Sequence, residues 1–116
     1  MDKIRILIAD DHAPFRNGLR TLLKTAPECE LVGEVTSGEQ AIAQAYHLQP
    51  DAILMDIQMP VMDGLEAMRL IRKVEALRHV PIVALTALAM PGDRERCLEA
   101  GATAYLIKPV NLRTLL

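Results

Sequence analysis

The sequence predicts an α/β domain of three layers, in which helices cover both faces of a parallel sheet. Its 116 residues suit a single domain. Short apolar runs alternate with longer amphipathic stretches along the chain, and several of the runs are apolar at consecutive positions, as expected for strands covered on both faces. Parallel strands joined by right-handed helical crossovers then form a doubly wound α/β/α sandwich.

The apolar runs give the positions of the expected strands. Each run is short, and turn-forming or charged residues bound it, which favours a strand over a helix of the core. Five strands are predicted, at residues 4–9, 31–35, 52–55, 82–86 and 104–107.

Helical periodicity occupies the segments between the strands. In the first of these segments Phe15, Leu19 and Leu23 share one face of a helix. Capping residues predict where the other helices begin and end. Thr36 and Ser37 can cap the second helix, Asp63 the third and Asn111 the fifth, while Gly92 and Asp93 open the fourth and Gly101 closes it.

The fifth helix is expected to be incomplete. It starts near Asn111, and the sequence ends at Leu116. A helix that covers its share of the sheet needs about two more turns. We therefore expect residues 1–116 to form one domain whose fifth helix is truncated.

Composition and charge exclude several classes of function. Hydrophobic residues make up 51% of the chain, charged residues 24%, and the net charge is -2, so no basic footprint for nucleic acid is expected. No apolar run approaches the roughly 20 residues of a membrane helix, and the amino end lacks a signal-peptide pattern. Cys29 and Cys97 lack CxxC spacing, which favours a reducing, cytoplasmic location.

Chemically active side chains follow four of the expected strands. Asp10 and Asp11 end the first strand, Asp56 the third, Thr86 the fourth and Lys108 the fifth. Doubly wound sheets bind ligands beyond the carboxyl ends of their strands, so these groups should meet at one edge. Each residue alone fits a turn, a cap or a strand end, but the combination indicates a functional site.

The carboxylates of this edge predict a metal ion. Three close carboxylates repel one another, which raises their pKa values, and a divalent cation removes the repulsion. An all-oxygen site with few carboxylates suits Mg²⁺ or Mn²⁺. Beside a lysine and a threonine, such a cation neutralises a phosphoryl group during transfer. Asp56 is then the nucleophile, held at the tip of a buried strand.

Four segments resemble the signature segments of the receiver domains of bacterial two-component response regulators, in the order of that family. They read IADDH, ILMDIQMPVMDG, ALTA and YLIKP, and the resemblance covers essentially the whole chain. It implies a receiver domain over residues 1–116, with a flavodoxin-like sheet whose strand order is 2-1-3-4-5.

The resemblance also assigns roles to the residues of the site. Asp56 is the expected phosphoacceptor, which receives a phosphoryl group from the phosphohistidine of a histidine kinase or a histidine phosphotransfer protein. Asp11 and Asp56 are expected Mg²⁺ ligands together with the backbone carbonyl of Gln58, and Asp10 is expected to assist through water. Such a protein is a signalling module and not an enzyme.

A switch is implied by the same resemblance. Lys108 and Thr86 are expected to bind the phosphoryl oxygens, and Tyr105 to turn inward when Thr86 moves. The fourth helix, fifth strand and fifth helix then shift between two arrangements. A cis peptide bond is expected between Lys108 and Pro109.

The readout face and the lifetime of the acyl phosphate are further expectations. The exposed face is expected to include Leu88, Met90, Arg94 and Tyr105. Gln58 and Leu88 flank the route by which water reaches the acyl phosphate, and Leu88 has no group that could orient this water. Slow self-hydrolysis is therefore expected.

Three alternatives stay open. A Mg²⁺-dependent phosphohydrolase with an aspartyl intermediate uses D-x-D, but Gln58 stands at the second position. A nucleotide or flavin binder needs a Gly- or Ser/Thr-rich loop after the first strand, where this chain has Asp10 and Asp11. A receiver that no longer accepts phosphate would serve as a pure interaction module, although the site carries no sign of degradation.

The output lies outside these residues. IADDHAPFRNGL is similar to receivers attached to DNA-binding domains, whereas PGDRERCLEAGATAYLIKPV is more similar to receivers of hybrid histidine kinases. The second cue is favoured slightly. No contact with nucleic acid or membrane is expected from this domain alone, and a homodimer stays open.

Overall fold

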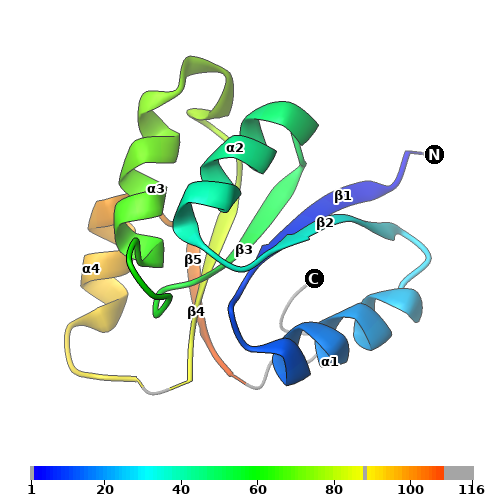
Figure 1. The fold of residues 1–116 in the computed structure, drawn as a ribbon, viewed down its shortest axis with the longest axis horizontal. Helices are drawn as coiled ribbons and strands as arrows, with labels where there is room; N and C mark the ends of the chain where they lie inside the picture. Colours follow the sequence, from blue (N-terminus) through cyan, green and yellow to red (C-terminus); the bar gives the residue numbers. More distant parts are fainter. Residues whose placement is uncertain (1, 88, 109–116) are drawn as a thin grey trace.

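The chain forms a parallel sheet of five strands in the order β2-β1-β3-β4-β5, which Figure 1 shows between two layers of helices. The structure, a computed structural model, describes residues 2–87 and 89–108. The predicted strand order is confirmed. The strands are β1 (Ile4–Ala9), β2 (Cys29–Val35), β3 (Ala52–Asp56), β4 (Ile82–Thr86) and β5 (Ala104–Ile107).

The helices lie between the strands, as the periodicity predicts. Three of the described helices, α2, α3 and α4, cover one face of the sheet, and α1 lies on the opposite face (Figure 1). A short 3-10 helix, η1, precedes β4. The bounds are α1 (Ala13–Lys24), α2 (Gly38–Leu48), α3 (Gly64–Lys73), η1 (Glu75–Leu77) and α4 (Asp93–Ala100). None of the helices within the described ranges is long and apolar enough to cross a bilayer.

Two hydrophobic clusters hold the layers together. The first joins α2, α3 and α4 to the sheet through side chains such as Ile53 and Met68, and the second joins α1 through Leu19 and Ile8. The central strands β1 and β3 are buried on both faces, so their apolar runs are continuous. The edge strand β2 starts at Cys29, two residues earlier than predicted. The prediction missed its first two residues because buried and exposed positions mix along this strand, and Cys29 and Glu30 do not form an apolar run.

The predicted caps Ser37, Asp63, Gly92 and Gly101 are confirmed, whereas Thr36 directly precedes the N-cap of α2. Ser37 accepts a hydrogen bond from the backbone N–H of Gln40, and Asp63 accepts one from Glu66. Gly92 and Gly101 flank α4 in the left-handed conformation. The predicted fifth helix with its cap at Asn111 lies outside the described residues.

Arg72 ties the carboxyl end of α4 to the rest of the domain. Its Nε and Nη2 donate to the backbone carbonyl of Gly101, at 2.9 and 2.7 Å. Its Nη1 donates to the carbonyls of Leu77, Arg78 and Val80, the last at 2.6 Å. Burial lowers the pKa of this guanidinium, yet it stays charged because arginine titrates far above neutral pH. One side chain thus satisfies carbonyls from the end of α4 and from the segment before β4.

Removal of this guanidinium should destabilise the domain strongly. Arg72→Met leaves several carbonyls without a donor, and we expect the free energy of unfolding to fall by about 2–4 kcal/mol. Urea denaturation measures the change. Arg69→Met, at an exposed position of the same helix, is the matched control and should change stability by less than about 0.5 kcal/mol. Equal losses in the two variants would show that the carbonyl contacts do not stabilise the fold.

Candidate functional site

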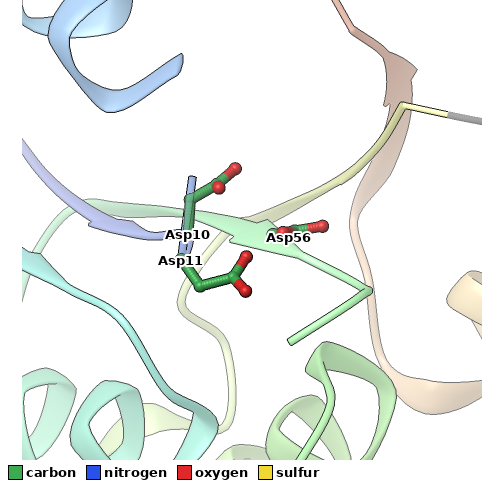
Figure 2. A group of neighbouring side chains, drawn as sticks. All are labelled: Asp10, Asp11 and Asp56. Carbon is green, nitrogen blue, oxygen red and sulfur yellow. The ribbon is translucent and has the colours of Figure 1, made fainter. Parts of the chain in front are cut away.

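Three carboxylates meet at the carboxyl edge of the sheet. Because β1 and β3 are parallel neighbours, the residues that follow β1 lie beside the end of β3. Asp10, Asp11 and Asp56 offer oxygens that all lie within 4.8 Å of one another, and Figure 2 shows the three side chains at these strand ends. Asp10 and Asp56 are 0% and 4% exposed, whereas Asp11 is open to solvent. The predicted convergence of these carboxylates is therefore present.

Lys108 brings an ammonium group to the same edge. Its Nζ lies 2.6 Å from Oδ2 of Asp10 and 3.6 Å from Oδ2 of Asp56, and the side chain is only 11% exposed. The backbone N–H of Lys108 donates to the carbonyl of Thr86 at 2.7 Å, which anchors the end of β5 on β4. The cluster holds three carboxylates and this one ammonium, so it carries an excess of negative charge.

The environment of Asp56 raises its pKa to about 6. Burial is the largest cause; repulsion by Asp10 and then Asp11 adds to it, while a hydrogen bond and the Lys108 ammonium act in the opposite direction. The hydrogen bond comes from the backbone N–H of Gln58, at 3.0 Å from Oδ1. Repulsion between carboxylates, which the sequence predicts as the cause, is thus smaller than desolvation. Asp56 is mainly ionised at neutral pH and able to act as a nucleophile.

An open cleft gives access to these groups. Its volume is about 650 Å³, enough for a small anion with its hydration shell. Asp11, Asp56 and Lys108 all lie on its wall. The residues that line it are Asp11, His12, Pro14, Phe15, Asp56, Gln58, Ala87 and Lys108.

The two expected switch residues, Thr86 and Tyr105, differ in burial. Thr86 ends β4 and is 0% exposed, directly before the cleft residue Ala87. Tyr105 is half-buried against the core cluster of α2, α3 and α4, and its hydroxyl is buried without a hydrogen-bond partner among residues 2–87 and 89–108. Burial, reinforced by the Asp93 carboxylate, raises the pKa of Tyr105. The aromatic ring therefore faces inward.

Of the other predicted positions, two are exposed on the surface and two lie outside the described residues. Met90 and Arg94 are exposed beside α4, as expected for a readout face. Leu88 and Pro109, with the expected cis peptide bond, lie outside the described residues. The roles of Thr86 and Tyr105 as a switch stay predictions.

Two residues of the site were not identified from the sequence. Phe15 was assigned only to the core face of the first helix, but its ring lies against the Lys108 ammonium. Gly64 opens α3 beside Asp56, and its backbone N–H donates to the carbonyl of Ile57 at 3.3 Å. A Cβ at this position would lie 2.2 Å from the carbonyl oxygen of Asp56. The signal for Gly64 was available, because glycine is a poor helix former and its place within a helix calls for a packing reason.

Two glycine substitutions should therefore have opposite effects. Gly64→Ala forces backbone apart at Asp56, and we expect a loss of about 2 kcal/mol or more in the free energy of unfolding. Gly18→Ala, the matched control, adds a methyl group within α1 where no atom lies within 4 Å. It should stabilise the domain by about 0.5–1 kcal/mol, because alanine favours helix. Thermal or urea denaturation distinguishes the two, and a stabilised Gly64→Ala would refute the close approach.

Neutralising Asp56 should stabilise the metal-free protein. The pKa of Asp56 rises on folding from 3.8 to about 6, so the folded state binds the proton more tightly and ionisation costs stability as pH rises through this window. At neutral pH, Asp56→Asn should unfold with a free energy on the order of 2 kcal/mol higher than wild type. The gain should shrink towards zero as pH falls from about 6 to 3.8.

Urea denaturation of both proteins in a chelating buffer, repeated across this pH range, measures the difference. Asp51→Asn, at an exposed carboxylate just before β3, is the control for the loss of a negative charge without burial. A variant less stable than wild type at neutral pH would contradict the burial argument.

Solved structures share this fold. The receiver domain of the sensor histidine kinase PA1611 from Pseudomonas aeruginosa, with a magnesium ion coordinated in its active site cleft, is 41% identical, with a TM-score of 0.87 over 97% of this chain and 91% of that one. A two-component response regulator of the LuxR family from Aurantimonas sp. SI85-9A1 is 29% identical, with a TM-score of 0.89 over 98% and 80%.

The sequence relatives are response regulators as well. The response regulator protein VraR of Staphylococcus aureus is 38% identical over 112 residues, which are 97% of this chain and 53% of VraR. The chain thus spans about half the length of the curated relatives it matches. Residues 6–116 match the family described as response regulator receiver domain. The strand order agrees with this match, and the chain therefore belongs to the receiver domain family of two-component response regulators, which serves phosphorelay signalling.

Proposed function

We propose that this receiver accepts a phosphoryl group on Asp56, from the phosphohistidine of a histidine kinase or a histidine phosphotransfer protein. One observation carries the proposal. Asp56 is a nearly buried carboxylate at the tip of a rigid strand, on the wall of an open cleft, with an ammonium 3.6 Å from Oδ2. A nucleophile, a group that stabilises negative charge and a path for the donor are therefore together.

Mg²⁺ is the proposed cofactor, and Mn²⁺ the expected substitute. Asp11, Asp56 and the backbone carbonyl of Gln58 would hold it, with Asp10 acting through water. The donor set fits a hard cation, because three carboxylates offer oxygens within 4.8 Å of one another and their negative charge exceeds that of Lys108. When bound, Mg²⁺ supplies positive charge that offsets the carboxylates and the phosphoryl oxygens. The magnesium ion of the PA1611 receiver supports this assignment.

The transfer needs little covalent chemistry from the protein. An Asp56 carboxylate oxygen attacks phosphorus, the bond from phosphorus to the donor imidazole breaks, and an acyl phosphate forms. Lys108 is placed to pair with the transferred phosphoryl oxygens, since its ammonium already lies between Asp10 and Asp56. Positioning and charge stabilisation are the main contributions of a protein to phosphoryl transfer.

The proposed response involves the two residues behind the site. In it Thr86 donates its hydroxyl to the phosphoryl group, and Tyr105 fills the space that this movement leaves, biasing the face formed by α4, β5 and the fifth helix. The exposed side chains of Met90 and Arg94 support this assignment of the face. Phosphorylation would shift a population between two arrangements that both exist beforehand.

Partners and output follow from the same proposal. The kinase or phosphotransfer protein docks at the cleft, and the output domain or target acts at the α4–β5 face. Relatives matching this chain include both a sensor histidine kinase receiver and regulators of the LuxR family, so the output attached to this receiver stays a prediction.

Small phosphodonors test the proposal directly. Incubated with acetyl phosphate and Mg²⁺, the chain should gain the mass of one phosphoryl group, and removal of Mg²⁺ by a chelator should abolish the gain. Asp56→Asn should gain nothing, whereas the exposed control Asp51→Asn should be modified like wild type. Intact-mass spectrometry measures all four samples.

Three results would contradict the proposed function. Modification of Asp56→Asn would place the acceptor elsewhere. An unmodified wild type would leave the interaction module as the better description. Release of phosphate from p-nitrophenyl phosphate at a steady rate would favour the phosphohydrolase, which the Gln58 side chain argues against because it cannot serve as the second acid.

A further inference from the structure

The Lys108 ammonium has a third neighbour besides its two carboxylates. Its Nζ lies 4.3 Å from the centroid of the Phe15 ring, inside the range in which the face of an aromatic ring attracts a cation. Phe15 is half-buried and lines the same cleft as Asp56 and Lys108. A residue of the first helix thus contacts the functional group at the end of the fifth strand.

The position of this ring is fixed by the start of α1. Pro14 occupies the first turn of the helix and restricts its backbone. Arg16 donates from Nη1 to the carbonyl of Asp10 at 2.7 Å, which ties this turn to the end of β1. Arg20 pairs with Glu34 on β2 at 2.8 Å. The ring is therefore held on a helix that is braced against the two neighbouring strands.

Asp10 and Phe15 hold the ammonium in different ways. The Asp10 contact, at 2.6 Å, is shorter than the Asp56 contact at 3.6 Å, so ion pairing alone keeps the ammonium nearer to Asp10. Both carboxylates belong to the proposed metal and phosphoryl site, and their charge is redistributed when that site is filled. Among the described contacts of Lys108, the ring face is the one that neither metal binding nor phosphorylation uses.

We propose that Phe15 is a positioning residue, whose ring face holds the Lys108 ammonium over the cleft, where the phosphoryl group arrives. The inference rests on the proposed function and adds a positioning residue to it. Phe15, on the apolar wall of the cleft, orients Lys108, and Lys108 binds the phosphoryl oxygens. Core packing alone does not account for the ring, because Phe15 packs against the α1 cluster and also lines the cleft beside the Lys108 ammonium.

Beryllium fluoride, a mimic of the phosphoryl group, provides the measurement. Phe15→Leu retains an apolar side chain but lacks the ring face, and its affinity for beryllium fluoride in saturating Mg²⁺ should fall by roughly threefold to thirtyfold. Phe15→Tyr retains the ring and should bind within about twofold of wild type. The affinity of both variants for Mg²⁺ alone, measured by calorimetry, should equal that of wild type.

A control variant separates positioning from stability. Leu22→Ala removes a partly buried side chain from the same helix and the same core cluster, so it should lower stability without changing the affinity for beryllium fluoride. Equal binding by wild type and Phe15→Leu, equal losses in the leucine and tyrosine variants, or a parallel loss of Mg²⁺ affinity would each overturn the inference. A wild type that does not bind beryllium fluoride would instead overturn the proposed function.

The ring can also be altered without changing its shape. Phe15 is the sole phenylalanine among the 116 residues, so fluorinated phenylalanine added during expression replaces this ring alone. Each added fluorine weakens the negative potential of the ring face, and the affinity for beryllium fluoride should fall stepwise with the number of fluorines. An affinity that is independent of fluorination would show that the ring acts only as a spacer.

Discussion

Excess negative charge at the carboxyl edge of the sheet is the constraint on which the rest of this structure depends. Asp10 and Asp56 are nearly without solvent, Asp11 adds a third carboxylate, and Lys108 supplies one ammonium. Burial of unbalanced charge costs free energy, and the raised pKa of Asp56 is the measure of that cost here. The edge therefore favours the binding of a cation. The free energy gained by packing the hydrophobic sheet offsets the cost of the buried carboxylates.

The fold makes this arrangement from short local signals. The strands β1, β3, β4 and β5 end within one residue of their apolar runs, and the order of the strands places these ends side by side. Backbone hydrogen bonds beyond the strands continue the alignment, as from Lys108 to Thr86 and from Ile57 to Leu85. Residues that are 98 positions apart, Asp10 and Lys108, come within 2.6 Å of each other in this way.

The strands, helices and strand-end residues of this domain could be predicted from sequence because their signals are local. Runs such as 52–55 are buried on both faces and read as strands, and Asp63 caps α3 through its own side chain. The contact of Phe15 with Lys108 could not be predicted, since an apolar helical residue gives no sign of which neighbour its ring faces. The main cause of the pKa of Asp56 was also missed, because desolvation depends on the completed packing around the strand tip.

The clamp formed by Arg72 has a mechanical consequence. It fixes the carboxyl end of α4 at Gly101, so in the proposed response a displacement at the end of β4 would tilt this helix about its Gly101 end. With 8 residues, α4 is about 12 Å long, and a tilt of about 5° moves its first turn by about 1 Å. In the proposed response a small tilt of α4 would therefore displace its amino end more than its anchored end at Gly101.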